Sequence, residues 1–394
     1  MVEKLIQAQA IRRFRAPVLV GVILVALFVD LAFRPEPIGV DFHTYAAASL
    51  VGLQTGWSYI YDQTLVTIAQ VEMPTRVWSQ PYLSPPPVAW MVAPLTPLPY
   101  PIAFGIWAFM ILAVYVAALA WATNYRGFPR VLVVAAAVAP WYVISAVHVG
   151  QVAPLIAAGL VVAWRLLRQN RDVAAGVVLT VVLFKPNTAL LAPVALAVAG
   201  RYRAFTAWVV SAAALVGISA LSLGPHGVQA YVDDLMHVPP QILHNASLQT
   251  IEGTFGLSGT AALALRAAIV LVAMVTAYRL RGSPWLAMVV GAMASLMTAS
   301  YLHPSDICVF VASGWILWHE RPSVSWRALL IGLWFVALPF LRIVGWGVPL
   351  NRWLLLELVL FLVLIVDGWI RRQAATAEPV SLTTTAEFSR RVPA

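Results

Sequence analysis

Long runs of apolar residues, separated by short segments that hold most of the charge, constrain this chain more than any other feature. Hydrophobic residues make up 61% of its 394 residues and charged residues only 10%. A water-soluble domain could not tolerate so much apolar surface. The pattern predicts an all-α polytopic membrane protein, and we expect it in a bacterial inner or plasma membrane.

The apolar runs predict about 12 membrane-spanning helices, judged against a hydrocarbon core of about 30 Å. We place them at residues 17–33, 101–122, 130–147, 152–167, 172–184, 187–200, 204–223, 260–279, 284–300, 305–318, 327–344 and 353–370. The run within residues 86–98 is too short to cross and indicates a re-entrant or broken helix, which protein must cover. The short runs on either side of Lys185-Pro186 could instead form one interrupted hairpin.

Basic residues between the runs set the expected orientation. With a cytoplasmic amino terminus, most of the 25 lysines and arginines fall on the cytoplasmic side, as the positive-inside rule requires. We therefore interpret the net charge of +9 as a topology signal and expect no nucleic-acid partner. One transmembrane domain is predicted over residues 1–370, followed by a disordered cytoplasmic tail at 371–394.

Two outer segments interrupt the apolar runs. The first outer loop, residues 34–85, is too polar to cross, and its pieces 42–53 and 65–78 are expected as helices at the membrane interface. The second is a long outer loop at residues 224–259. Its Asp233-Asp234 pair could bind a divalent cation through oxygen ligands, but adjacent loop acids are more often solvated.

Asp41, in the first outer loop, is the leading candidate for chemistry on the outer side. It could cap the helix that starts at Phe42. It could instead be a general base that takes a proton from a hydroxyl, since partial burial would raise its pKa toward a useful range.

Lys185 is unusual because it lies between two apolar runs on the side that lysines avoid. It suits an anionic lipid phosphate, although snorkelling to the interface is the ordinary alternative. His303 could stabilise a phosphate or shuttle a proton. Other polar candidates on this side are Tyr45, His148, Gln151, Asn187 and Arg342.

Several short motifs occur in order along the chain. They are Asp41-Phe42 with Tyr45, Tyr59-Ile60-Tyr61-Asp62, Tyr82-Leu83-Ser84-Pro85-Pro86, Ala93-Pro94-Leu95, Gly150-Gln151, Ala174-Ala175-Gly176, Lys185-Pro186 and Arg201-Tyr202-Arg203. Together they resemble glycosyltransferase family 87, of the membrane-embedded GT-C class, over about residues 17–320. No one motif is specific, but their order and spacing are.

The resemblance implies a GT-C fold and transfer of one sugar from a polyprenyl-phosphate carrier to a glycolipid or glycan hydroxyl on the outer face. We expect mannose or arabinofuranose as the sugar. Asp41 matches the family's catalytic acid, Lys185 matches its Lys-Pro motif, and His303 falls where some members carry a histidine. Lys185, His303 and Arg342 would hold the donor phosphate, and Tyr45, His148, Gln151 and Asn187 the substrates. No cofactor is expected, with a divalent metal left open.

Two other classes of function remain. A transporter or flippase for a lipid-linked sugar would place its binding groups near the bilayer midplane and often shows inverted repeats. In this chain the candidate binding groups fall on one side of the membrane, and the sequence shows no internal repeat. A structural membrane protein without chemistry would leave Asp41 and Lys185 replaceable.

Overall fold

The computed structural model describes residues 38–75, 77–237, 250–320, 323–338, 349 and 352–377. Within these residues every regular element is a helix, which confirms the prediction of an all-α chain. The first predicted span, 17–33, and the candidate Arg342 lie outside the described residues, so both stay predictions.

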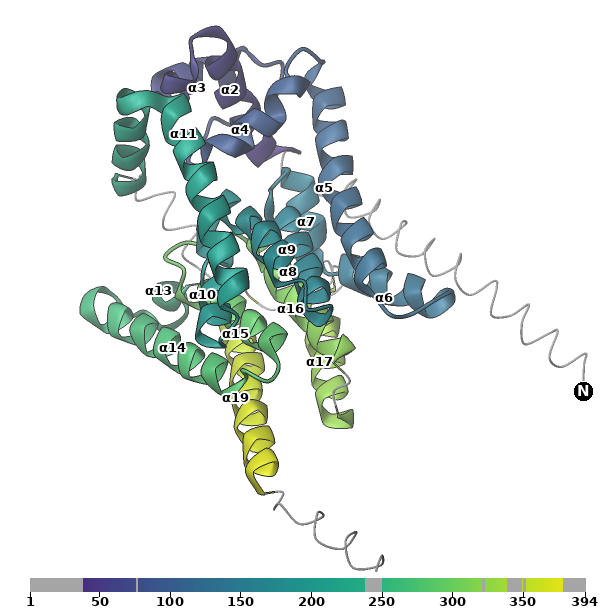
Figure 1. Cartoon of the computed structure of the whole chain (residues 1–394). Coiled ribbons are helices and arrows are strands. Elements are labelled where there is room, and N and C mark those ends of the chain that lie inside the picture. The colour runs from purple at the N-terminus through teal and green to yellow at the C-terminus, as the bar shows by residue number, and fades with distance from the viewer. Residues whose placement is uncertain are drawn as a thin grey trace, which may run out of the picture.

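Three helices from the first outer loop form a layer at one end of the molecule (Figure 1). They are α2 (Val40–Gln54), α3 (Gln63–Glu72) and α4 (Pro86–Val92), joined by the 3-10 turns η1 (Trp57–Tyr59) and η2 (Ala93–Leu95). Both predicted segments are thus helical, and their place at the membrane interface stays a prediction. The second ends at Glu72 rather than at residue 78, because Pro74 pushes Met73 into extended backbone.

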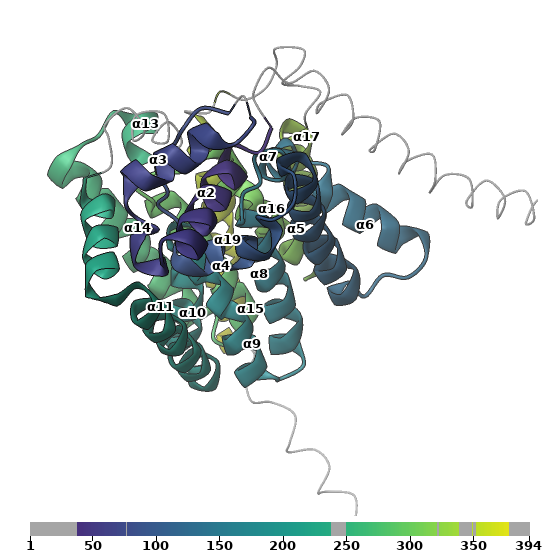
Figure 2. The same cartoon turned by 90° about the horizontal axis from the view of Figure 1, so that it is seen from above.

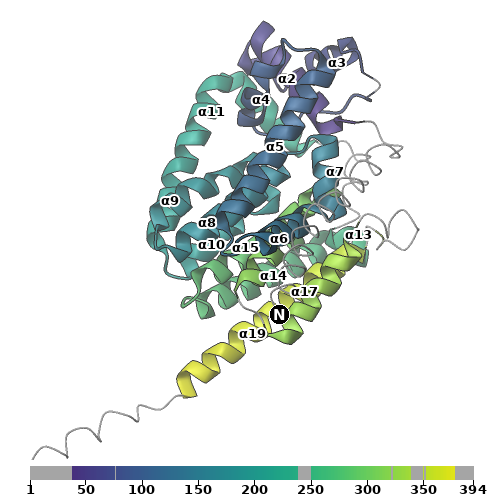
Figure 3. The same cartoon turned by 90° about the vertical axis from the view of Figure 1, so that its right-hand side faces the viewer.

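The other helices lie below this layer, except that one end of α5 (Tyr100–Ala122) and one end of α11 (Tyr202–Met236) reach up beside it (Figures 1 and 3). They are α5, α6 (Phe128–Val138), α7 (Trp141–Val149), α8 (Ala153–Arg168), α9 (Asp172–Val178), η3 (Leu179–Phe184), η4 (Pro186–Thr188), α10 (Leu191–Val198), α11, α13 (Ile251–Phe255), α14 (Gly259–Arg279), α15 (Pro284–Thr298), η5 (Pro304–Ile307), α16 (Cys308–His319), α17 (Val324–Val336) and α19 (Trp353–Ala377). Each predicted span within the described residues coincides with one of these helices, or with a helix and an adjoining turn or helix.

Three of the described helices, α5, α11 and α14, are long and apolar enough to cross a membrane. The pair α6 and α7 makes a fourth if it is one span bent by 65° at Pro140. Large apolar side chains of α11 and α14, including Val210, Leu221 and Leu271, are exposed. Such faces are stable only against lipid or protein, which supports a membrane environment.

Two predicted segments differ in the structure. The long loop predicted at residues 224–259 begins as helix, because α11 kinks at Gly224, where φ is +62°, and continues to Met236. The carboxyl-terminal tail predicted as disordered from residue 371 is helical up to Ala377, since α19 extends through residues of high helix propensity.

Helices α8 and α16 run side by side in the middle of the molecule (Figure 2). Each begins two residues after a polar side chain described below, Gln151 before α8 and Asp306 before α16. At their other ends Arg168 Nη1 pairs with Glu320 Oε1 at 2.8 Å. At 1.5 Å per residue the 16 residues of α8 hold these two polar ends about 24 Å apart.

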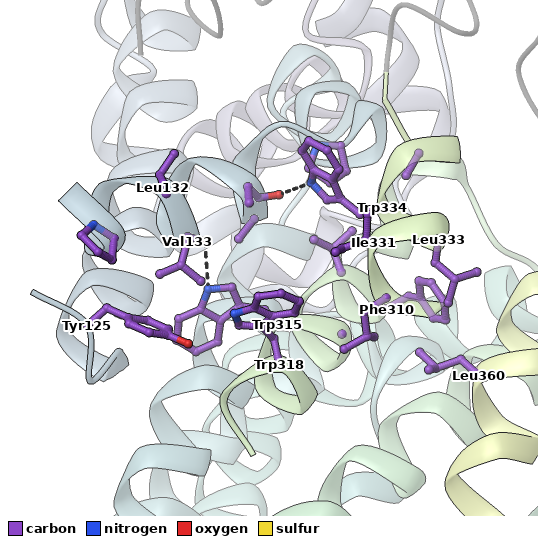
Figure 4. Close-up of a pocket in the computed structure, with 18 of the residues that line it drawn as sticks. Tyr125, Leu132, Val133, Phe310, Trp315, Trp318, Ile331, Leu333, Trp334 and Leu360 are labelled. Atoms are coloured by element: carbon purple, nitrogen blue, oxygen red, sulfur yellow. Dashed lines mark hydrogen bonds between the residues drawn. The ribbon is translucent and has the colours of Figure 1, made fainter. Parts of the chain in front are cut away.

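An apolar pocket of about 460 Å³ opens between α6, α16 and α17 (Figure 4). Aromatic rings line it, among them Phe310, Trp315 and Trp334. Two of the lining indole N–H groups are bonded within the wall, since Trp315 donates to the Val133 carbonyl at 3.1 Å and Trp334 to that of Ala136 at 2.7 Å. The pocket therefore offers a ligand little except apolar contact.

Candidate active site

Asp41 lies in the first turn of α2, one residue after the helix begins. The residue that caps this helix is Gly39, in the left-handed conformation at φ +79° and without a side-chain cap. The alternative in which Asp41 caps its own helix is therefore wrong. A carboxylate in the first turn is still favoured by the partial positive charge of the helix amino terminus.

A pair of side chains fixes the Asp41 carboxylate in place. Gln151 donates from Nε2 to Asp41 Oδ2 at 2.9 Å, and Tyr45 donates its hydroxyl to Gln151 Oε1 at 2.6 Å. Tyr45 and Gln151 are only 2% and 4% exposed. Both were predicted to bind substrate, but in the structure their polar atoms hold Asp41, so we now propose a positioning role for them.

The turn before α8 must come very close to α2 for this contact to form. Gly150 has φ +77°, and a Cβ added there would lie 2.7 Å from Cβ of Phe42. Trp107 also donates its indole N–H to the Gly150 carbonyl at 2.8 Å. Only glycine satisfies both the left-handed backbone and the close approach.

Lys185 forms a buried ion pair. Its Nζ lies 2.7 Å from Oδ1 of Asp306, and the two side chains are 10% and 0% exposed. Burial lowers the pKa of Lys185, but the charges of Asp306, Tyr301 and Asp41 together outweigh this effect, and the net pKa is raised. Lys185 is thus a charged group inside the protein, which excludes the simple snorkelling alternative.

His303 is held in a reciprocal hydrogen-bonded turn with Asp306. The Asp306 carboxylate accepts the His303 backbone N–H at 2.9 Å, and the His303 ring accepts the backbone N–H of Asp306. A ring nitrogen that accepts a hydrogen bond carries no proton, so the other nitrogen of the neutral ring is a donor. Burial and the charge of Lys185 lower the pKa of His303, in agreement with a neutral ring.

These three chain segments form one electrostatic cluster. Burial raises the pKa of Asp41 above its ordinary 3.8, and it outweighs the opposing effects of His303, Lys185 and the hydrogen bond from Gln151. Asp306 adds to the rise through repulsion between the two carboxylates. The cluster thus unites a carboxylate suited to accept a proton with an ammonium and an imidazole N–H suited to an anion.

The remaining predicted residues lie beside this cluster. Asn187 donates from Nδ2 to the Tyr301 carbonyl at 2.9 Å, which ties the turn after Lys185 to the segment that leads to His303. His148 is 1% exposed, and its carbonyl accepts the backbone N–H of Gly39 at 2.8 Å. Substrate contacts for both stay predictions.

Asp306 is the residue that sequence reasoning did not include in the site. It touches both Lys185 and His303 and is fully buried. A signal was present in His303-Pro304-Ser305-Asp306, because proline favours the first helical position and an acid three residues after the cap is typical of a capping box. That signal predicts a helix start, but not the ion pair with a residue far away in the chain.

Comparison with known proteins gives one match. A family model described as glycosyltransferase family 87 matches residues 82–304. No curated protein and no solved structure matches the chain. Lys185 and His303 lie inside the matched segment, whereas Asp41 precedes it and Asp306 follows it by two residues.

Proposed function

The chain belongs to glycosyltransferase family 87, whose model covers more than half of it, and we propose that it transfers one sugar from a polyprenyl-phosphate donor to a hydroxyl acceptor. The family makes it a membrane glycosyltransferase. The donor, the acceptor, an active site on the outer face of the membrane and the GT-C fold are parts of the proposal. The observation that carries it is the joining of Asp41, Lys185 and His303 in one cluster.

In the proposed reaction the acceptor oxygen attacks the anomeric carbon as the bond from that carbon to the phosphate oxygen breaks. The acceptor proton passes to Asp41, and the polyprenyl phosphate leaves with the bonding electrons. A carboxylate with a raised pKa is the better base here, because a hydroxyl is a poor nucleophile at neutral pH. Attack from the face opposite the phosphate inverts the anomeric carbon.

Lys185 and His303 would stabilise the negative charge that builds up on the leaving phosphate. The ammonium has three donors, and its contact with Asp306 leaves others available. With Asp41 ionised, two carboxylates and one ammonium sum to a single negative charge. A phosphate therefore needs a further positive group, which is the role predicted for Arg342.

A divalent cation could provide the same charge. Over the parts of the chain that the structure describes, no group of three or more His, Cys, Asp or Glu side chains is placed to hold a metal. We propose Arg342 for this charge, as the sequence resemblance implies, with a divalent cation as the alternative.

The apolar pocket supports a lipid-linked donor. Phe310 lines it, and Phe310 follows Asp306 by four residues, about one helical turn. A polyprenyl chain in this pocket would bring its phosphate to the level of Lys185. The pocket's lack of polar groups also argues against a soluble sugar nucleotide at this place.

A donor panel tests the proposed function. We expect the protein in lipid nanodiscs to release polyprenyl phosphate from one of four donors, carrying mannose, arabinofuranose, glucose or galactose, when lipid from its host is added. Activity that persists in EDTA would agree with the metal-free assignment. If no donor is turned over but a lipid-linked sugar crosses proteoliposome membranes, the transporter alternative replaces the enzyme.

The pH profile tests the general base. Because Asp41 must be ionised to act, and burial raises its pKa, kcat/KM should begin to fall on acidification above pH 3.8. The same shift means that the fold favours protonated Asp41, so protonating this group does not destabilise the protein. The loss should therefore reverse on return to neutral pH. An acid limb that stays at about pH 3.8 would rule out Asp41 as the base.

A further inference from the structure

A second, polar pocket lies at the end of the molecule formed by α2, α3 and α4, where the last part of α11 meets α3. Its volume is about 270 Å³, and its polar lining residues are Gln63, Thr67, Ser79, Gln80, Asp234 and His237. We call this site the polar pocket. It differs from the apolar pocket in both place and chemistry, and none of its residues belongs to the catalytic cluster.

The walls of the polar pocket are tied together by side-chain amides. Gln63 accepts the Tyr82 backbone N–H at 3.1 Å, and its Nε2 donates to the Tyr82 carbonyl at 3.2 Å and to Asp234 Oδ2. Gln70 holds the backbone of Gln80 in the same way. Its Oε1 accepts the Gln80 N–H at 2.9 Å, and its Nε2 donates to the Gln80 carbonyl at 2.8 Å. The pocket is thus largely preformed, which lowers the entropic cost of binding.

The polar side chains of the pocket that remain available for binding indicate the chemical class of its ligand. The side chains of Thr67, Ser79 and Gln80 make no hydrogen bond to another described residue, and Asp234 adds a carboxylate acceptor. The part of the lining that the structure describes contains no lysine or arginine, so a phosphate would meet a carboxylate without a cation. Hydroxyls, an amide and one carboxylate suit a neutral ligand rich in hydroxyl groups. Its small volume suits a sugar ring.

A short path of side chains joins the polar pocket to Asp41. Gln63 holds the backbone of Tyr82, and the Tyr82 ring meets the Tyr45 ring edge-on with centroids 6.3 Å apart. The Tyr45 hydroxyl in turn binds Gln151, which binds Asp41. Tyr82 and Tyr45 are only 0% and 2% exposed, so packed side chains separate the polar pocket from Asp41.

We propose that the polar pocket binds an uncharged sugar unit of the acceptor that lies apart from the hydroxyl that reacts at Asp41. The inference rests on the proposed function, and it names the acceptor class as a neutral glycan or glycolipid head. The carboxylate of Asp234 disfavours an anionic head group in the part of the lining that the structure describes.

Direct binding provides the first test. The full chain in lipid nanodiscs is titrated with methyl glycosides of mannose, glucose, galactose and arabinose, and binding is followed by saturation-transfer NMR. Thr67→Trp fills the pocket from α3, and Thr64→Trp is its matched control, because Thr64 is exposed on the same helix and is not among the lining residues. Ser79→Trp fills the pocket from the loop, in case the first variant does not fold.

We expect at least one glycoside to bind, with about tenfold weaker binding after either pocket-filling change, equal to about 1.4 kcal/mol, and no change in the control. Binding to none of the four sugars, or equal binding by all variants, would overturn the inference. A turnover test separates it from the proposed function. Thr67→Trp should raise KM for acceptor about tenfold while KM for donor is unchanged.

If Thr67→Trp leaves KM for acceptor unchanged in an active enzyme, the inference fails and the proposed function stands. If a sugar binds and the pocket-filling variants lose it, but no donor is ever turned over, the pocket assignment stands and the proposed function fails.

Discussion

Asp41→Asn is expected to lower kcat by about 10²–10⁴-fold while the protein stays folded, the range typical for loss of a general base. The amide oxygen of asparagine can still accept the hydrogen bond from Gln151, so the packing around α2 is kept. Unlike a carboxylate, however, the asparagine amide cannot take the proton from the hydroxyl of the acceptor substrate. Release of polyprenyl phosphate measures the rate, and thermal unfolding in nanodiscs measures the fold.

Asp62→Asn is the matched control for this experiment. Asp62 caps α3 by accepting the N–H groups of Thr64 and Leu65 at 3.0 and 3.1 Å, and asparagine caps a helix about as well as aspartate. The same chemical change in the same outer segment should therefore leave turnover as in the wild type. Near-normal turnover of Asp41→Asn would remove Asp41 as the base.

Asp306→Ala is expected to have the largest effect on stability, about 3–5 kcal/mol, because it leaves the Lys185 ammonium buried without its partner. It also removes the acceptor that holds the His303 backbone, so activity should be lost as well. The free energy of unfolding can be followed by denaturant titration in mild detergent. Arg201→Ala, which breaks the more exposed pair with Asp172 at 3.4 Å, should cost no more than about 1 kcal/mol.

The double change Lys185→Met with Asp306→Leu separates stability from function. Replacing a buried ion pair by apolar side chains of similar size is often close to neutral, so much of the lost stability should return. Transfer should not return, since no ammonium is left to stabilise the phosphate. Recovery of activity in this double variant would show that Lys185 has only a structural role.

The positions of the helices could be predicted well from the sequence, since apolar runs of 13 to 22 residues have few other solutions in a chain this apolar. The prediction was weaker where a local signal ends a helix. Met73, before Pro74, stops α3 early, and Gly224 bends α11 where a loop was predicted. Met73 and Gly224 each come directly before a proline. At the first position the proline, and at the second the glycine with its proline, sets the local backbone conformation.

The candidate site was only partly predictable. Asp41, Lys185 and His303 stand out because ionisable groups beside apolar runs are costly. Their meeting at one place depends on which helices pack together, and a single sequence does not contain that information. For the same reason the sequence could not predict the ion pair between Lys185 and Asp306. Nor could it predict the hydrogen bonds through which Tyr45 and Gln151 hold Asp41.

The pair of Lys185 and Asp306 also has a consequence for biogenesis. A membrane chain is synthesised from its amino terminus, so Lys185 enters the bilayer well before Asp306 has been made. Until the segment that precedes α16 arrives, the ammonium has no counter-ion, and the half-assembled chain carries an exposed polar defect. The ion pair can therefore close only after the chain has been made as far as the start of α16, and chains cut short before that point would keep an unpaired ammonium.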